Sequence, residues 1–174
     1  MIRFVEISKS SHQSFAENLY TLAFDADERR DFSQIPLIYN KINNHFYIIE
    51  KEQQPIAILA LWDLNQFLYI EHLAVSEQAR NQGIGSSIIE NLKNMYSKPI
   101  VLEVEQPFEP LQQRRIRFYE RLGFVLLPNN YIQPPYSPDK QSLQMRIMLS
   151  DENLLRFCPF ETIQARLHTS VYYL

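Results

Sequence analysis

The sequence is poor in the residues that build disulfides, metal sites and membrane spans. Cys158 is the single cysteine among 174 residues, so an internal disulfide and a cysteine-rich metal site are both excluded. None of the four histidines lies at metal-ligand spacing from another. The longest apolar run, residues 56–62, is too short to cross a bilayer, and the N-terminal residues lack the apolar core of a secretion signal. We therefore expect a cytoplasmic protein that needs no metal and binds no membrane.

Charge and composition also argue against some partners. The net charge is −3, which gives no electrostatic reason to expect nucleic-acid binding. With 45% hydrophobic and 21% charged residues, the composition is that of a folded globular protein. The chain has no repeat and no linker, so we expect a single domain over residues 1–174.

Hydrophobic periodicity predicts an α/β protein. Alternating or continuous apolar runs predict strands at 1–7, 45–51, 54–64, 65–75, 99–105, 124–128 and 141–149. Apolar residues at helical spacing predict helices at 14–24, 37–44, 83–96, 110–122 and about 159–172, and Gly123 is expected to end the fourth. Several antiparallel strands come first, and strands and helices alternate after them. This order favours a three-layer domain with a mixed sheet, and it leaves residues 129–140 as a Pro- and Tyr-rich connection.

Glycine is also scarce, with three residues in the chain. Gly83 and Gly85 lie close together in "ARNQGIGSS", between a predicted strand and a predicted helix. The first N–H groups of a helix lack internal partners and attract anions, and glycine lets a phosphate approach the main chain. A Rossmann turn would need a third glycine at Ile88, and a P-loop would need a lysine. The pattern present is R-x-x-G-x-G; the alternative is a tight turn that only starts a helix.

Two stretches resemble one known family. The segment "IEHLAVSEQARNQGIGSSIIENL" is similar to the acetyl-CoA binding motif of the GNAT superfamily of N-acetyltransferases, and "FYERLGF" is similar to its later motif. The resemblance implies a GNAT-like, mostly antiparallel sheet splayed at its two central strands, with acetyl-CoA as co-substrate. It also implies that the turn holds the CoA pyrophosphate. That turn comprises Arg80, Asn81, Gln82, Gly83, Ile84, Gly85 and Ser86.

The resemblance also assigns contacts to the rest of CoA. A main-chain N–H near Leu73, Ala74 or Val75 would polarise the thioester carbonyl, and the same strand would pair with the pantetheine arm. Gln112 stands where the family often has an asparagine that binds this arm. Arg115 falls on the apolar face of its helix, so we expect it to pair with Glu103 or Glu105, or to reach CoA.

Acetyl transfer to an amine needs a base for the ammonium and an acid for the departing thiolate. The resemblance places Tyr119 as the acid, although its spacing alone would suit core packing. Glu103 and Glu71 are the candidate bases, in that order, because a carboxylate in an apolar strand needs a partner, a water or a chemical role. The alternative for each glutamate is a solvated or salt-bridged side chain.

The expected activity is transfer of an acetyl group to a primary amine of a small molecule or peptide. The loops at 25–36 and 129–140 are expected near the acceptor, the first with an acidic excess and the second as an aromatic lid of Tyr131 and Tyr136. The alternative is a non-catalytic module of the same fold that binds CoA as a sensor. A homodimer through the C-terminal helix or a sheet edge is a further expectation.

Overall fold

The computed structural model describes every residue of the chain except residues 40 and 174. Two compact units divide the chain between them, and β4 contributes residues to both. Unit 1 comprises Met1–Asp63 and Ile70–Ser97, and unit 2 comprises Leu64–Tyr69 and Lys98–Leu174. The strand order is β1-β2-β3-β4-β5-β8-β6, with β7 paired to β8. This α/β arrangement with its mostly antiparallel sheet confirms the predicted fold class.

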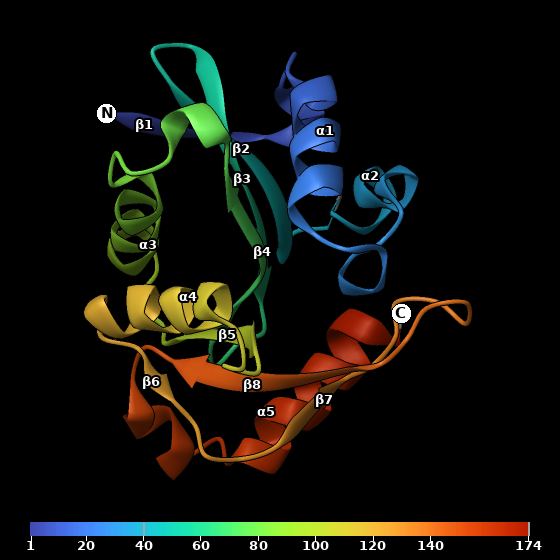
Figure 1. Cartoon of the computed structure of the whole chain (residues 1–174), viewed down its shortest axis with the longest axis vertical. Helices are drawn as coiled ribbons and strands as arrows, with labels where there is room; N and C mark the ends of the chain where they lie inside the picture. The colour runs from blue at the N-terminus through green and yellow to red at the C-terminus, as the bar shows by residue number, and fades with distance from the viewer. Residues whose placement is uncertain (40, 174) are drawn as a thin grey trace. The chain divides into compact units, whose positions relative to one another are not determined.

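Unit 1 is built on an antiparallel sheet with helices on both faces, α1 on one and α3 on the other (Figure 1). A two-residue turn joins β2 to β3, and Glu52 and Gln53 both have positive φ angles, as the twist of a tight hairpin requires. The middle of β3 is completely buried, which explains its continuous apolar sequence. The elements are β1 (Ile2–Glu6), α1 (Gln13–Ala23), α2 (Ile35–Ile38), β2 (Asn44–Lys51), β3 (Gln54–Asp63), β4 (Leu68–Val75) and α3 (Ile84–Met95).

Unit 2 is organised around β8, which pairs antiparallel with β5, β6 and β7. Helix α4 packs on β5 and β6, and α5 lies below β8 in the view of Figure 1. The elements are β5 (Ile100–Glu105), α4 (Pro110–Arg121), β6 (Val125–Leu126), β7 (Tyr131–Gln133), β8 (Leu143–Leu149) and α5 (Phe160–Leu167), followed by a π-helical turn (His168–Tyr172).

Two expectations about elements need correction. The connection at 129–140 is not all loop, because Tyr131–Gln133 form strand β7 on β8. The helix expected at 37–44 is instead a single turn, Ile35–Ile38, with Pro36 in its first turn where a missing N–H costs nothing. The C-terminal helix is confirmed, and its last turn widens to π geometry. None of the described helices is long and apolar enough to cross a membrane.

Gly123 ends α4 as predicted. Its φ angle is +84°, and the following residue, Phe124, donates its N–H to the Tyr119 carbonyl over 3.1 Å. This turn brings the Phe124 ring to 5.5 Å from the Tyr119 ring, measured between centroids. The left-handed conformation of Gly123 therefore places Phe124 against the Tyr119 ring within unit 2.

We expect Gly123→Ala to lower the free energy of unfolding by about 1–2 kcal/mol, because an L-residue is strained at positive φ. A Cβ at this position would meet nothing within 4 Å, so no steric clash adds to the cost. Urea unfolding would measure the change, with Gly123→Asn as the matched control that tolerates this conformation better. Equal stability of the alanine variant and the wild type would contradict the assignment.

Candidate functional site

The glycine turn of unit 1 leaves the start of α3 open to an anion. Gly83 is the residue before the helix and has a φ angle of +72°, and Asn81 is also left-handed at +61°. No side chain caps this helix end, and its first turn holds no acidic residue. A Cβ on Gly83 would meet nothing within 4 Å, so the space in front of it is free of described protein atoms. The first N–H groups of α3 can therefore receive a negatively charged group.

The side chains around this turn brace it. Arg80 donates through Nε to the Val75 carbonyl over 3.3 Å, and Gln82 donates through Nε2 to the Gln78 carbonyl over 2.9 Å. Ile84 is buried and anchors the first helical residue in the core, so its main chain is the part that could meet a ligand. Both polar side chains lie on the surface and can move without disturbing the core.

Strand β4, which precedes the turn, exposes part of its main chain. The Glu71 side chain is completely buried, yet the residue as a whole is not, so its accessible surface belongs to its main chain. Leu73 and Val75 are half-buried, and Ala74 between them is buried. The main chain of this strand is thus accessible to a ligand at Glu71.

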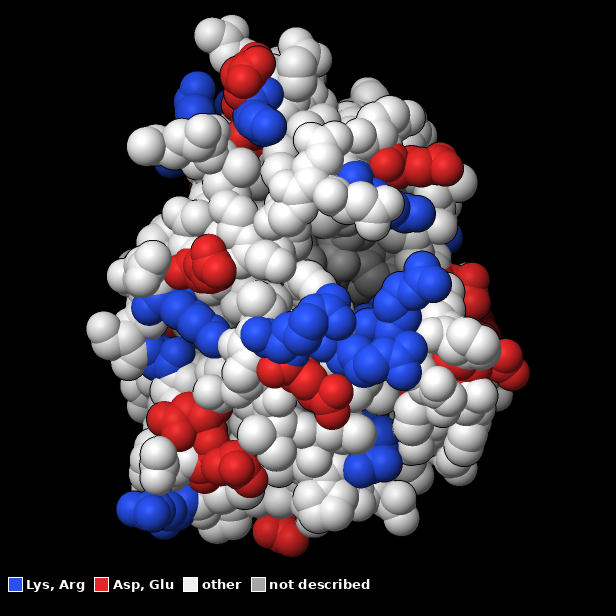
Figure 2. Space-filling model, turned by 60° about the vertical axis from the view of Figure 1, so that its left-hand side comes forward, with Lys and Arg blue, Asp and Glu red and all other residues white. Residues whose placement is uncertain are grey.

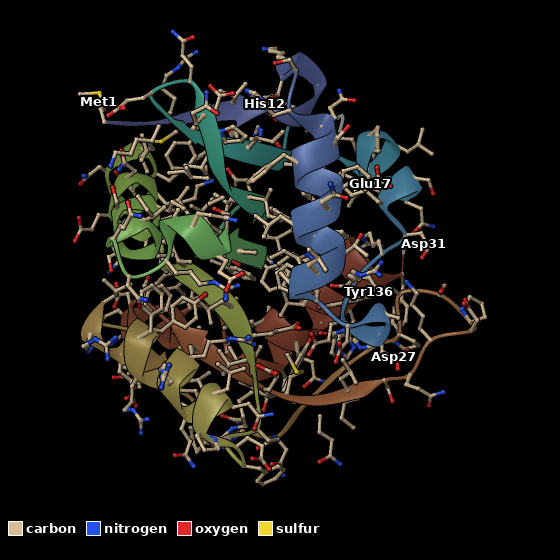
Figure 3. All side chains as sticks on the ribbon, turned by 45° about the horizontal axis from the view of Figure 1, so that its top comes forward. Met1, His12, Glu17, Asp27, Asp31 and Tyr136 are labelled. Carbon is tan, nitrogen blue, oxygen red and sulfur yellow. The ribbon has the colours of Figure 1, made fainter. Side chains whose placement is uncertain are left out.

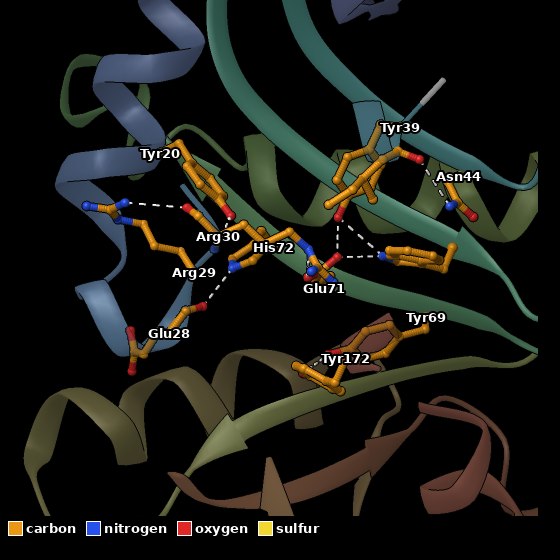
Figure 4. Close-up of polar contacts among 12 residues, drawn as sticks. Tyr20, Glu28, Arg29, Arg30, Tyr39, Asn44, Tyr69, Glu71, His72 and Tyr172 are labelled. Atoms are coloured by element: carbon orange, nitrogen blue, oxygen red, sulfur yellow. Dashed lines mark hydrogen bonds and ion pairs between the residues drawn. The ribbon is translucent and has the colours of Figure 1, made fainter. Parts of the chain in front are cut away.

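Glu71 lies in a polar cluster inside unit 1 (Figure 4). Its Oε2 accepts hydrogen bonds from the Tyr39 hydroxyl and from Trp62 Nε1, the latter over 2.5 Å. Its Oε1 lies 3.4 Å from Arg30 Nε in an ion pair that is almost completely buried. Burial alone would raise the pKa of Glu71, but the charge of Arg30 and the hydrogen bonds from Tyr39 and Trp62 outweigh it and lower this pKa. Glu71 is therefore a firmly ionised carboxylate.

Hydrogen bonds near the same cluster also hold the 25–36 loop, which is expected beside the acceptor. His72 lies 2.9 Å through Nε2 from the Glu28 carbonyl, and burial lowers the pKa of His72, so its neutral ring donates this bond. The main-chain N–H of Arg30 donates to the Tyr20 hydroxyl over 3.1 Å. The Arg30 side chain is buried, whereas Asp25 and Asp31 of the same loop are exposed. Asp31 is labelled in Figure 3, together with the half-buried Asp27.

Tyr119 of unit 2 presents a protonated hydroxyl. The residue is 8% exposed. Burial raises the pKa of Tyr119 to about 12, and the nearby charge of Arg115 opposes that rise. The ring packs against Phe118 and Phe124, so the side chain has one orientation and a free proton to donate.

Glu103 of unit 2 is held by tyrosines. The Tyr131 hydroxyl donates to Oε1 over 2.6 Å, and the Tyr172 hydroxyl donates to Oε2 over 2.8 Å. The Tyr69 hydroxyl lies 2.9 Å from that of Tyr172. The expected lid is wrong in one respect, because Tyr131 and Tyr136 are buried side chains that pack inward.

Arg115 and Gln112 on α4 have partners within unit 2. Arg115 donates through Nη1 to Glu105, which confirms one of the three partners expected for it. The Oε1 atom of Gln112 accepts the N–H of Glu109 over 2.9 Å and completes a capping box at the start of the helix. Part of the amide expected to bind pantetheine is thus already engaged.

The remaining arginines of α4 lie on the surface. Figure 2 shows Lys and Arg side chains gathered in a band on one face of the molecule, with Asp and Glu side chains directly beside them. Helix α4 exposes Arg114, Arg117 and Arg121. Mixed signs in close proximity do not form the continuous basic surface that nucleic acid requires.

Two other kinds of reactive group, the thiol and clusters of metal ligands, give no support for a second site among the described residues. Cys158 is buried, and burial raises the pKa of its thiol, as expected for a small core residue. Among residues 1–39 and 41–173, no group of three or more His, Cys, Asp or Glu side chains is placed to hold a metal ion. The partners of Glu71 and Glu103 could not be predicted from the sequence. Only the aromatic C-terminal run "SVYY" hinted at one of them, Tyr172.

Comparisons with known proteins identify relatives of this chain. The family model described as "Acetyltransferase (GNAT) domain" matches residues 43–126. A solved structure from Bacteroides thetaiotaomicron, "Putative acetyltransferase from GNAT family", is 35% identical, covers 100% of this chain and 99% of its own, and has a TM-score of 0.89. "Putative acetyltransferase YjbC" of Bacillus subtilis (strain 168) is 38% identical over 79 residues. That alignment covers 44% of this chain and 41% of the length of YjbC.

More distant solved structures share the fold. A variant of spermidine N-acetyltransferase SpeG from Vibrio cholerae has a TM-score of 0.60 at 15% identity, over 90% of this chain and 96% of its own. The ribosomal-protein-S18-alanine N-acetyltransferase from Escherichia coli has a TM-score of 0.60 at 14% identity, over 86% and 92%. At these identities the similarity concerns the fold alone.

We expect Arg30→Met to lower the free energy of unfolding by about 3–5 kcal/mol at neutral pH, because the Glu71 carboxylate would stay buried without its cation. In the wild type the pKa of Glu71 is lowered on folding, so its contribution is present above about pH 4.3 and is lost as the pH falls through the folded value. The loss caused by Arg30→Met should therefore shrink in acid. Urea unfolding at neutral and acidic pH would measure both effects.

The matched control is the double variant Arg30→Met with Glu71→Gln, in which no uncompensated charge is buried. It should recover much of the lost stability. Equal losses in the single and double variants at neutral pH would show that the ion pair does not determine the effect.

Proposed function

Because the chain belongs to the GNAT family of acetyltransferases, we propose that it transfers an acetyl group from acetyl-CoA directly to a primary amine. The observation that carries the proposal is the uncapped start of α3, where Gly83 leaves space for a phosphate. The comparisons support the reaction class. The local chemistry of the residues supports the roles that we propose for them.

The turn from Arg80 to Ser86 suits the CoA pyrophosphate. Its N–H groups, the left-handed Gly83 and the helix dipole all favour a compact dianion, and Gly85 adds no side chain to the first turn. Arg80 donates to the Val75 carbonyl through Nε, so its Nη atoms are the ones that would bind a phosphate. The exposed main chain of β4, with Leu73, Ala74 and Val75, would hold the pantetheine arm and polarise the thioester carbonyl.

We assign Gln112 to pantetheine only through its amide N–H groups, because its oxygen caps α4. Arg115 we assign to Glu105 rather than to CoA, since its Nη1 already donates to the Glu105 carboxylate. Arg115 then acts indirectly, by placing a positive charge near Tyr119.

Glu103 is our choice for the base, and Glu71 becomes an anchor. A lowered pKa makes Glu71 a weak base, and its oxygens already face Tyr39, Trp62 and Arg30. The two tyrosines that donate to Glu103 are uncharged, whereas Glu71 faces a guanidinium ion. In our proposal Glu103 accepts a proton from the ammonium, directly or through a water.

The proposed sequence of steps balances its protons. Glu103 removes a proton from the ammonium, the neutral nitrogen attacks the thioester carbonyl, and the carbon–sulfur bond breaks as the amide forms. The departing thiolate takes the proton of Tyr119, whose pKa of about 12 keeps it protonated beforehand. The attacking nitrogen loses its second proton as the amide forms, and this proton restores Tyr119. Net products are an N-acetylated amine, CoA and the one proton that Glu103 took from the ammonium and then releases to solvent.

The acceptor is the least defined component. The exposed acidic residues Asp25 and Asp31 of the 25–36 loop favour a cationic amine, and the fold is shared with enzymes named for spermidine and for ribosomal-protein-S18-alanine. The non-catalytic CoA sensor is the alternative, and the protonated hydroxyl of Tyr119 argues against it, because a pure binder does not need a proton donor. The expected homodimer has less support, since Tyr172 is used inside unit 2 and leaves Tyr173 as the exposed aromatic end.

We expect acetyl-CoA and desulfo-CoA to raise the melting temperature, because ligands that bind only the native state stabilise it. Gly83→Ala should abolish most of this shift by placing a methyl group where the pyrophosphate lies. Gly123→Ala is the matched control: it is also left-handed, and its Cβ also meets open space. It should destabilise the protein and keep the shift. ATP and NADH are the ligand controls, and no shift with any CoA species would refute the site.

Tyr119→Phe should bind acetyl-CoA normally and lose about 10²–10⁴-fold in kcat, the usual contribution of a general acid. The ring packing is kept, so stability should change little. Exposed Tyr173→Phe serves as the control variant. Full turnover by Tyr119→Phe with several amines would remove its assigned role.

A further inference from the structure

The C-terminal segment holds the proposed base. Tyr172 belongs to the π-helical turn His168–Tyr172, in which the Tyr173 N–H donates to the His168 carbonyl over 2.9 Å. Wider than an α-helical turn, it carries Val171 and Tyr172 into the interior and Tyr173 to the surface. The inward-pointing Tyr172 hydroxyl then reaches Glu103.

The hydrogen bonds around Glu103 have a fixed direction. A hydroxyl carries one proton, and Tyr172 donates its proton to Glu103 Oε2, so Tyr69 must be the donor in its bond to Tyr172. Tyr131 donates to the other oxygen, Oε1. One tyrosine therefore restrains each oxygen of the carboxylate, and a third supports one of them.

These tyrosines remain proton donors. Burial raises the pKa of Tyr131 and of Tyr172, and the negative charge of Glu103 raises both further. A hydrogen bond to the charged form of a carboxylate stabilises that form. The two hydroxyls thus keep Glu103 ionised while they fix its plane.

We propose that Tyr172 and Tyr131 are positioning residues that orient Glu103 and keep it deprotonated for catalysis, so that the C-terminal π-turn is part of the catalytic machinery. The inference rests on the proposed function, because it takes Glu103 as the base. It assigns a role in the reaction to the segment His168–Tyr172, which lies outside both the glycine turn and α4 in the sequence.

The test is the pH dependence of kcat/KM in Tyr172→Phe. Loss of a hydrogen bond to the ionised form raises the pKa of Glu103, so the acid limb should move to higher pH by about one unit. The phenyl ring keeps its contact with Tyr136, whose centroid lies 5.0 Å away, so the variant should fold. Tyr131→Phe should shift the limb in the same direction, and Tyr69→Phe, one bond further away, should shift it less.

The controls separate this inference from the proposed function. Tyr173→Phe should leave the profile unchanged, and using the same amine throughout cancels the ionisation of the acceptor. A ¹³C titration of the Glu103 carboxyl should report the same rise in pKa in both phenylalanine variants, independently of turnover. If Glu103→Gln is inactive but neither variant moves the limb or the titration, the positioning role is overturned and the base stands. If Glu103→Gln keeps full activity, the assignment of the base fails, and the positioning role fails with it.

Discussion

A carboxylate inside a protein must be compensated, and this requirement shapes both units. Removing an ionised group from water costs several kcal/mol unless a cation or hydrogen-bond donors replace its hydration. Two carboxylates on strands matter for the proposed function, Glu71 on β4 with a completely buried side chain and the half-buried Glu103 on β5. Segments distant in sequence are drawn onto these strands because they carry the donors. The loop after α1 supplies Arg30, and the chain end supplies Tyr172.

The kind of donor separates the two glutamates chemically. A guanidinium ion lowers the pKa of Glu71 and fixes it as an anion, which makes it a good anchor and a poor proton acceptor. The tyrosines seen on Glu103 are neutral donors, so they orient the carboxylate without adding a positive charge to it. The same residue type on two strands can thus serve structure in one unit and, as we propose, chemistry in the other.

Local signals made part of this molecule predictable. The two glycines marked the start of α3, Gly123 marked the end of α4, and the arginine on an apolar face predicted a carboxylate partner for Arg115. These features depend on residues close together in sequence, where periodicity and turn chemistry are informative. Strand β7 escaped prediction because it has three residues, bordered by asparagines and prolines, which are typical of turns.

The partners of the glutamates were not predictable in the same way. Tyr131 is 28 residues from Glu103 in sequence, and Tyr172 is 69 residues away. Their contacts depend on strand register and on a π-turn, neither of which leaves a periodic pattern. The apolar strand around Glu103 was enough to make it the first candidate for the base. Its hydrogen bonds from Tyr131 and Tyr172 could be identified only in the three-dimensional structure.

Tyr119 combines a packed ring with a protonated hydroxyl. Its ring packs between aromatic neighbours, a role that phenylalanine would fill equally well. Packing therefore explains the ring and not the oxygen. With a pKa of about 12 the hydroxyl stays protonated at neutral pH, so it still carries the proton that the proposed reaction passes to the thiolate.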